Sequence, residues 1–168
     1  MTDSSSALNS PFSPVRPSKA GFRSQWGRLY GSSYGLVLSA TAAQHTGPVL
    51  VITADMAAAQ RLEYSLRFYM AEEDISILQF PDWETLPYDR FSPHQDIISE
   101  RLTTLSRLPD LTQGILITPI QTLMHRIAPK SYLDGFCLSL TLEQKFDIDE
   151  MRLRLEHSGY NCVSSVME

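Results

Sequence analysis

The residues with the clearest chemical potential form a short run of glycine, serine and tyrosine, Gly31-Ser32-Ser33-Tyr34-Gly35. The run matches the G-x-S-x-G pattern of a serine hydrolase, in which Ser33 would be the nucleophile. That pattern works only where a strand enters the turn and a helix leaves it, because this geometry lifts the serine above a sheet. Residues 23–30 do not read as a buried strand, so a serine hydrolase using Ser33 is the least favoured interpretation.

The same run has a second interpretation, as a phosphate-binding loop that has lost its function. A working loop needs a lysine for the β and γ phosphates and a following serine or threonine for magnesium. Tyr34 stands at the lysine position and Gly35 at the next one. We therefore predict no functional cofactor-binding residue and no cofactor for this chain. The alternatives are a residual nucleotide-binding, helicase-like ATPase domain and a plain turn before a helix.

A second candidate region is rich in aromatic residues and prolines and follows the apolar run 75–78. Its first residues, Phe80-Pro81-Asp82, resemble a magnesium-holding Walker B segment, but Pro81 intervenes and the partner lysine is missing. Aromatic side chains on an ordered loop either pack the loop onto the sheet or anchor a partner, and packing is the favoured interpretation. The candidate interaction residues are Trp83, Tyr88, Asp89, Phe91, Pro93 and His94.

The charge balance argues against direct, strong DNA binding by this chain. It carries 14 Lys and Arg against 19 Asp and Glu, a net charge of −5, and shows no basic cluster. Phosphate contacts from basic residues supply most of the affinity of nucleic-acid binders. No apolar run approaches the roughly 20 residues that cross a bilayer, and no secretory signal is seen. We expect a cytoplasmic protein with no membrane partner.

No metal site is predicted, because no potential ligands have the spacing of a known metal motif. Cys137 and Cys162 read as buried thiols in a reducing compartment. Glu100 and Arg101 read as the solvated face of a helix. The four histidines read as surface or capping residues: His45, His94, His125 and His157.

The elements that must position these residues alternate between strands and helices. Apolar runs at 49–53, 75–78 and 114–118 predict strands, and the first of them suits burial on both faces of a parallel sheet. Helices are expected at 36–43, after Asp55, after Ser92 and from Thr118 to about Arg126, each of the last three with the named residue as its cap. The fold class is therefore α/β, with three layers and a mostly parallel sheet.

The apolar faces of two of these helices can be read from their spacing. The helix after Asp55 carries apolar residues three and four apart, and the helix after Ser92 carries a similar row. The first set is Met56, Ala59, Leu62, Leu66 and Tyr69, and the second is Ile98, Leu102, Leu105 and Leu108.

The chain divides into three parts by composition. Residues 1–18, rich in serine and proline, are expected to form a disordered tail. Residues 19–128 form the first α/β domain. Residues 131–168 predict a strand at 136–141, a helix capped by Asp147 and a strand at 161–167. This last part is too small to hold a core by itself, so it is expected to begin a second α/β subdomain.

One stretch is highly specific to a known family. Residues 82–102, which begin Asp-Trp-Glu-Thr-Leu-Pro-Tyr-Asp, are very similar to a signature region of the transcription-repair coupling factors (Mfd). The similarity continues through residues 114–124, 158–160 and 166–168. On these residues the chain is identified as a member of that family.

The resemblance implies a large cytoplasmic ATP-dependent DNA translocase, which displaces stalled RNA polymerase and recruits UvrA for nucleotide excision repair. The family's N-terminal region is similar to UvrB. Residues 19–128 would thus be a UvrB-like domain with a degenerate nucleotide loop, and residues 131–168 the start of the UvrA-binding subdomain. ATP and magnesium would belong to the downstream motor, and RNA polymerase and DNA would bind only through domains outside this chain.

The resemblance also implies that the residues contacting UvrA lie beyond Glu168. Residues 91–114 leave no room for the DNA-clamping hairpin of UvrB, because a capped helix occupies them. We therefore predict a non-catalytic interaction module that serves UvrA recruitment in transcription-coupled nucleotide excision repair.

Overall fold

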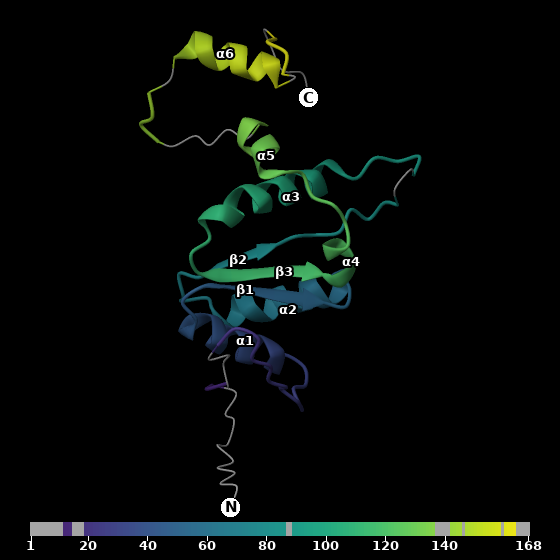
Figure 1. Ribbon diagram of the computed structural model, residues 1–168, viewed down its shortest axis with the longest axis vertical. Helices are drawn as coiled ribbons and strands as arrows, with labels where there is room; N and C mark the ends of the chain where they lie inside the picture. The colour runs from purple at the N-terminus through teal and green to yellow at the C-terminus, as the bar shows by residue number, and fades with distance from the viewer. Residues whose placement is uncertain are drawn as a thin grey trace, which may run out of the picture. The chain divides into compact units, whose positions relative to one another are not determined.

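The computed structural model describes residues 12–14, 19–86, 89–136, 142–145, 147–158 and 160–163, with the backbone alone at 134–136. The chain divides into two compact units, Met1–Ile127 and Ala128–Glu168 (Figure 1). The candidate site residues that the structure describes all belong to the first unit.

The first unit is built on a sheet of three parallel strands. They are β1 (Pro48–Thr53), β2 (Ser76–Gln79) and β3 (Gly114–Pro119), in the order β1-β3-β2. Pro48 and Ser76 both lie opposite Gly114, so the three strands start level with one another. The predicted α/β fold with a parallel sheet is confirmed.

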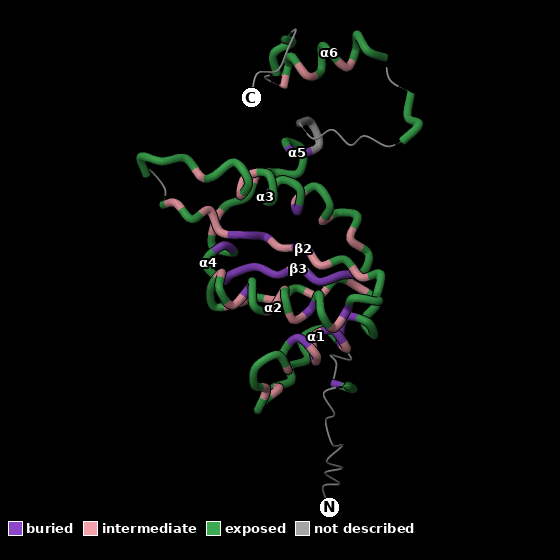
Figure 2. The backbone as a smooth tube through the Cα atoms, turned by 180° about the vertical axis from the view of Figure 1, so that it is seen from behind, coloured by how far each residue is buried: buried purple, intermediate pink, exposed green. Residues whose placement is uncertain are grey.

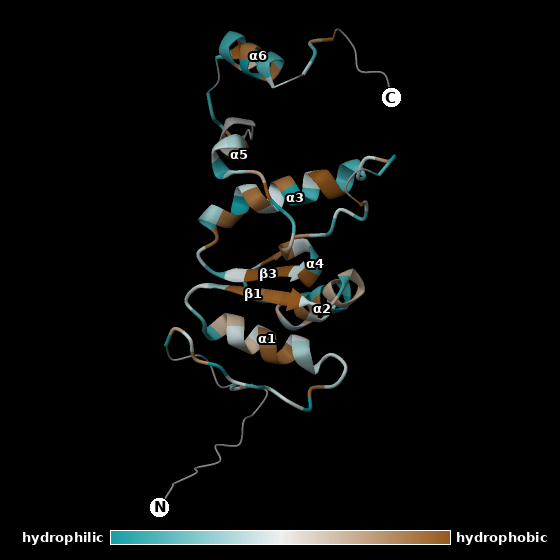
Figure 3. Ribbon diagram, turned by 45° about the vertical axis from the view of Figure 1, so that its right-hand side comes forward, coloured by the Kyte–Doolittle hydropathy of each residue, from teal (hydrophilic) through white to brown (hydrophobic). Residues whose placement is uncertain are grey.

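Helices cover this sheet on two sides. Helix α2 (Met56–Tyr69) contacts all three strands and packs against α1 (Ser33–Gln44), whereas α3 (Gln95–Arg107) packs against β2. The two groups lie on opposite sides of the sheet (Figures 1 and 3). None of the helices in the described part of the chain has the length and apolar character needed to cross a membrane. The helical segments are α1 (Ser33–Gln44), α2 (Met56–Tyr69), α3 (Gln95–Arg107), the 3-10 turn η1 (Leu108–Asp110) and α4 (Ile120–Leu123).

The core lies between α2 and β3. Ala59 and Leu66 of α2 and Ile115 and Ile117 of β3 have no exposed surface, and β3 is the most buried strand (Figure 2). The apolar stripe expected on the helix after Asp55 is thus confirmed. Asp55 also caps that helix, because its carboxylate accepts the Ala58 N–H at 2.7 Å.

One face of β1 differs from the expected burial. Leu50 is 52% exposed and Ile52 is 50% exposed, so the prediction of a strand buried on both faces is wrong. The strand lies at an edge of the sheet, and its apolar character is continuous (Figure 3). Burial therefore alternates along it although hydrophobicity does not.

Two helix starts also differ from the expected caps. Helix α3 begins at Gln95 rather than at Pro93, and His94 instead of Ser92 is its cap, with Nδ1 accepting the Asp96 N–H at 3.3 Å. Thr118 belongs to β3, and its hydroxyl donates to the Phe80 carbonyl at 3.1 Å. Both segments match a capping pattern, but the Thr118 hydroxyl is used in a tertiary hydrogen bond instead.

The second unit contains α5 (Lys130–Phe136) and α6 (Ile148–His157). Asp147 caps α6 as expected, because its carboxylate accepts two backbone N–H groups. The strand expected at 136–141 is wrong at Phe136, which ends a helix, and residues 137–141 lie outside the described residues. Residues 161–163 form no strand, and residues 164–168 likewise lie outside the described part.

Replacement of Leu66 tests the position of the core. Leu66→Ala removes a side chain with no exposed surface, so we expect the free energy of unfolding to fall by about 2–5 kcal/mol in urea denaturation. Tyr64→Ala on the same helix is the matched control, because Tyr64 is 80% exposed. Its change should stay within about 0.5 kcal/mol. Equal losses in both variants would contradict the arrangement.

Candidate functional site

The glycine- and serine-rich run forms the start of α1. Gly31 adopts a left-handed backbone conformation, with φ of 56°, and Ser33 opens the helix. Among residues 19–32, all described, no strand leads into the run. The Ser33 hydroxyl donates to the Tyr30 carbonyl at 2.7 Å, and Ser32 and Tyr69 share a hydrogen bond of 3.1 Å. The strand-turn-helix geometry of a nucleophile elbow or a phosphate-binding loop is therefore not formed by these residues.

Gly35 has a packing role that the sequence did not reveal. It is buried, and a Cβ atom built on it would lie 2.6 Å from the Cβ atom of Ser65. Side-chain atoms cannot approach so closely, so α1 and α2 lie in contact only because residue 35 lacks a side chain. A helix-packing requirement explains this glycine without reference to phosphate.

A cavity of about 840 Å³ adjoins the run. Its lining is mainly apolar and includes Leu38, Val51 and Leu62, with Tyr34 at the start of α1. Arg61 is the only cationic side chain among the lining residues, all of which the structure describes. Triphosphate binding relies on a lysine and on backbone N–H groups that converge on the phosphates. The cavity as built suits apolar groups better than a triphosphate.

The aromatic region after β2 is residues 80–94, which we name the signature loop. Its described residues, 80–86 and 89–94, form neither helix nor strand. Phe80 and Pro81 are buried and Trp83 is half-buried, so packing accounts for its first part, as the sequence interpretation favoured. Leu86 and Phe91 are 77% and 78% exposed.

The other candidate interaction residues of the signature loop contribute in different ways. Pro93 is half-buried, and the imidazole of His94 caps α3. Asp89 is exposed, and its carboxylate accepts the N–H of Arg90 at 2.7 Å. Tyr88 lies outside the described residues.

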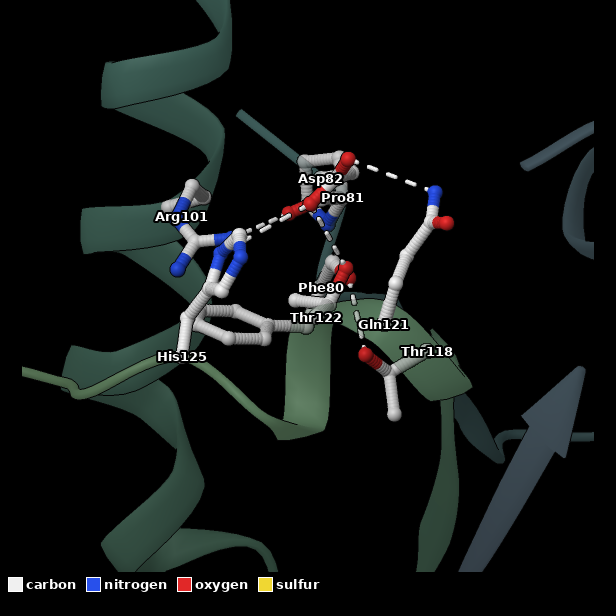
Figure 4. Close-up of polar contacts among 8 residues, drawn as sticks. All are labelled: Phe80, Pro81, Asp82, Arg101, Thr118, Gln121, Thr122 and His125. Atoms are coloured by element: carbon white, nitrogen blue, oxygen red, sulfur yellow. Dashed lines mark hydrogen bonds and ion pairs between the residues drawn. The ribbon is translucent and has the colours of Figure 1, made fainter. Parts of the chain in front are cut away.

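Arg101 of α3 is the clearest departure from the sequence interpretation. Its side chain was expected in solvent, but it is only 2% exposed. The guanidinium carbon lies 4.0 Å from the ring centres of both Phe80 and Trp83, and an N–H group donates to the Pro81 carbonyl (Figure 4). Burial lowers the pKa of Arg101 below its ordinary value, and the negative charge of Asp82 acts in the opposite direction. Glu100 stays exposed, as expected.

Asp82 joins the signature loop to the segment after β3. One carboxylate oxygen accepts from Gln121 at 3.3 Å, and the other accepts from the Thr122 hydroxyl at 3.3 Å (Figure 4). His125 lies 3.8 Å from the same carboxylate, close enough for an ion pair when the imidazole is protonated. The Walker B interpretation of Asp82 gains no support, because protein groups already use both oxygens.

A cavity of about 710 Å³ lies beside this junction. Apolar side chains from the signature loop, α3 and the end of α4 line it. One acidic and one basic side chain lie beside them. The apolar lining residues include Trp83, Leu86, Phe91, Ile98 and Met124, and the charged ones are Asp89 and Arg126.

Metal ligands and cysteines give no second site. No group of three or more potential metal ligands forms within the described residues. Cys162 is exposed, so the expectation of a buried thiol is wrong there, and Cys137 lies outside the described residues.

Comparison with known proteins places the chain. It is 43% identical over 152 residues, 90% of its length, to the transcription-repair-coupling factor of Escherichia coli. The chain belongs to the transcription-repair-coupling factor family. Members from Haemophilus influenzae and Mycobacterium tuberculosis are 39% and 30% identical over 94% and 95% of the chain.

The chain spans only 13% of the length of these three transcription-repair-coupling factors. No family model matches it. The matched part includes both the glycine-rich run and the signature loop, because the alignments cover nearly the whole chain.

Substitution of Gly35 tests its role in the packing of α1 against α2. Gly35→Ala forces α1 away from Ser65, and we expect the free energy of unfolding to fall by about 1–3 kcal/mol. Gly27→Ala is the control, since nothing lies within 4 Å of the added atom. The cost of Gly35→Ala should shrink in a Ser65→Gly background, as measured by a double-mutant cycle. Additive costs would show that the two residues do not meet.

Proposed function

We propose that this chain is the N-terminal, non-catalytic interaction module of a transcription-repair-coupling factor and serves UvrA recruitment in nucleotide excision repair. Family membership supports the setting, because the relatives are named for coupling transcription to repair. The resemblance of the chain to the UvrB-like region of the family supplies the partner. ATP-driven translocation, RNA polymerase and DNA binding belong in this proposal to the rest of the longer protein.

The start of α1 is the single observation that carries the non-catalytic part of the proposal. Tyr34 and Gly35 replace the two side chains that would hold phosphate and magnesium. Gly35 is also packed against Ser65, so the first turn of α1 faces a neighbouring helix. The adjoining cavity is apolar and offers one cation, Arg61.

The signature loop is the proposed protein-contacting feature of this chain. Leu86 and Phe91 expose large apolar side chains on an irregular segment whose base is fixed to α3 and α4. Exposed aromatic anchors beside an apolar cavity are typical of protein interfaces. This surface complements the UvrA contacts that the resemblance places beyond Glu168.

Binding to UvrA tests the proposal directly. We expect UvrA to bind this protein when it is extended past Glu168 by the segment that the resemblance places there, as measured by isothermal titration calorimetry. The chain ending at Glu168 should bind more weakly, because the resemblance places the residues that contact UvrA beyond Glu168. No measurable association of UvrA with the extended protein would overturn the proposed function.

Nucleotide binding tests the loss of phosphate chemistry separately. We expect no heat of binding for magnesium-ATP at micromolar concentrations and no shift of the thermal melting temperature, because the lysine that grips the phosphates is missing. The matched variant is Arg61→Ala, which removes the only cation in the lining of the adjoining cavity. A micromolar ATP signal that Arg61→Ala abolishes would favour the residual nucleotide-binding domain instead.

A further inference from the structure

The guanidinium of Arg101 is buried without an acidic partner in contact. The side chain is 2% exposed, and no carboxylate among the residues that the structure describes forms an ion pair with it. Removing a charged group from water is unfavourable unless other groups replace its hydration. Here a carbonyl and two aromatic rings do so, and all three come from the base of the signature loop.

The contacts of Arg101 reach consecutive parts of that base. The two rings against which the guanidinium lies belong to Phe80 and Trp83. The guanidinium also donates a hydrogen bond to the carbonyl of Pro81, which lies between them in the sequence. Thr104, one turn further along α3, donates to the Gln79 carbonyl at 2.6 Å. One side of α3 therefore follows the chain as it leaves β2.

One backbone conformation in the signature loop has to be held in place by contacts of the neighbouring residues. Glu84 has a φ of 57°, in the left-handed region that residues with a side chain rarely adopt. Contacts that over-determine the neighbouring residues are needed to hold such a conformation. Asp82 and Trp83 supply them, through α4 on one side and Arg101 on the other.

We propose that Arg101 is a positioning residue, which fixes residues 80–83 at the base of the signature loop so that Leu86 and Phe91 are presented to UvrA in one preset arrangement. The interface role rests on the proposed function, whereas the positioning of the loop does not. A loop ordered before binding loses less conformational freedom on association, so an interface built on it binds more tightly for the same contacts. The planar guanidinium suits this task because it stacks on rings and donates from its edge at the same time.

Hydrogen exchange in the chain alone, without UvrA, tests the inference. Arg101→Met keeps an apolar stem but removes the stacking cation and the donor. We expect amide exchange at residues 82–86 and 89–92 to rise about tenfold or more, the factor expected when a hydrogen bond from a charged group is lost. Exchange in α2 and β3 should be unchanged. Arg101→Lys should restore part of the protection, because it keeps the charge without the planar fork.

Arg107→Met is the control, because Arg107 is an exposed arginine on the same helix and should leave exchange everywhere unchanged. Unaltered exchange in the loop of Arg101→Met would overturn the inference, as would a uniform rise that includes β3, since Arg101 would then only stabilise the fold. If Arg101→Met does not fold, the same two outcomes are judged on Arg101→Lys. If the extended wild-type protein does not bind UvrA, the proposed function is overturned. The result of the hydrogen-exchange experiment on Arg101 is not affected by that outcome.

Discussion

Parallel pairing of β3 with both β1 and β2 is the constraint from which the first unit follows. Parallel strands end at the same edge of the sheet, so the segments after β2 and β3 must meet there. This brings Asp82 to Gln121 and Thr122, and it brings the Thr118 hydroxyl to the carbonyl of Phe80. The topology of the sheet thus places the first residues of the signature loop beside α4, where the Asp82 carboxylate anchors them.

Local patterns in the sequence predicted most of this scaffold. The apolar runs marked all three strands, and residues spaced three and four apart marked α2, because those periods reflect backbone geometry that neighbouring residues share. Asp55 and Asp147 acted as predicted caps for the same local reason. Leu50 and Ile52 were assigned to the wrong environment, because position within a sheet depends on strand order and not on the strand itself.

The candidate site was less predictable, since its contacts join residues distant in the chain. Arg101 read as solvent-facing because a charged side chain is seldom buried unless partners elsewhere replace its hydration. Those partners are Phe80 and Trp83, and most of the signature loop separates them from Arg101 in the sequence. Their spacing gives no sign that both rings contact the same side chain. His94 caps α3 in place of Ser92, so the helix starts two residues later than the local pattern indicated.

The two candidate regions differ in which side chains remain exposed to solvent after their internal contacts are made. At the start of α1, the serine hydroxyls form hydrogen bonds with Tyr30 and Tyr69, and the buried glycine packs against Ser65, so these residues serve the packing of the helix. In the signature loop the reverse holds, because polar and aromatic groups near its base are consumed in fixing it while Leu86 and Phe91 stay exposed. An apolar residue in place of Arg101 would fill the same space with less desolvation, but it could not also hold a carbonyl. Keeping a buried cation there favours a defined loop shape over maximal stability, which is the balance that a contact surface requires and a simple core does not.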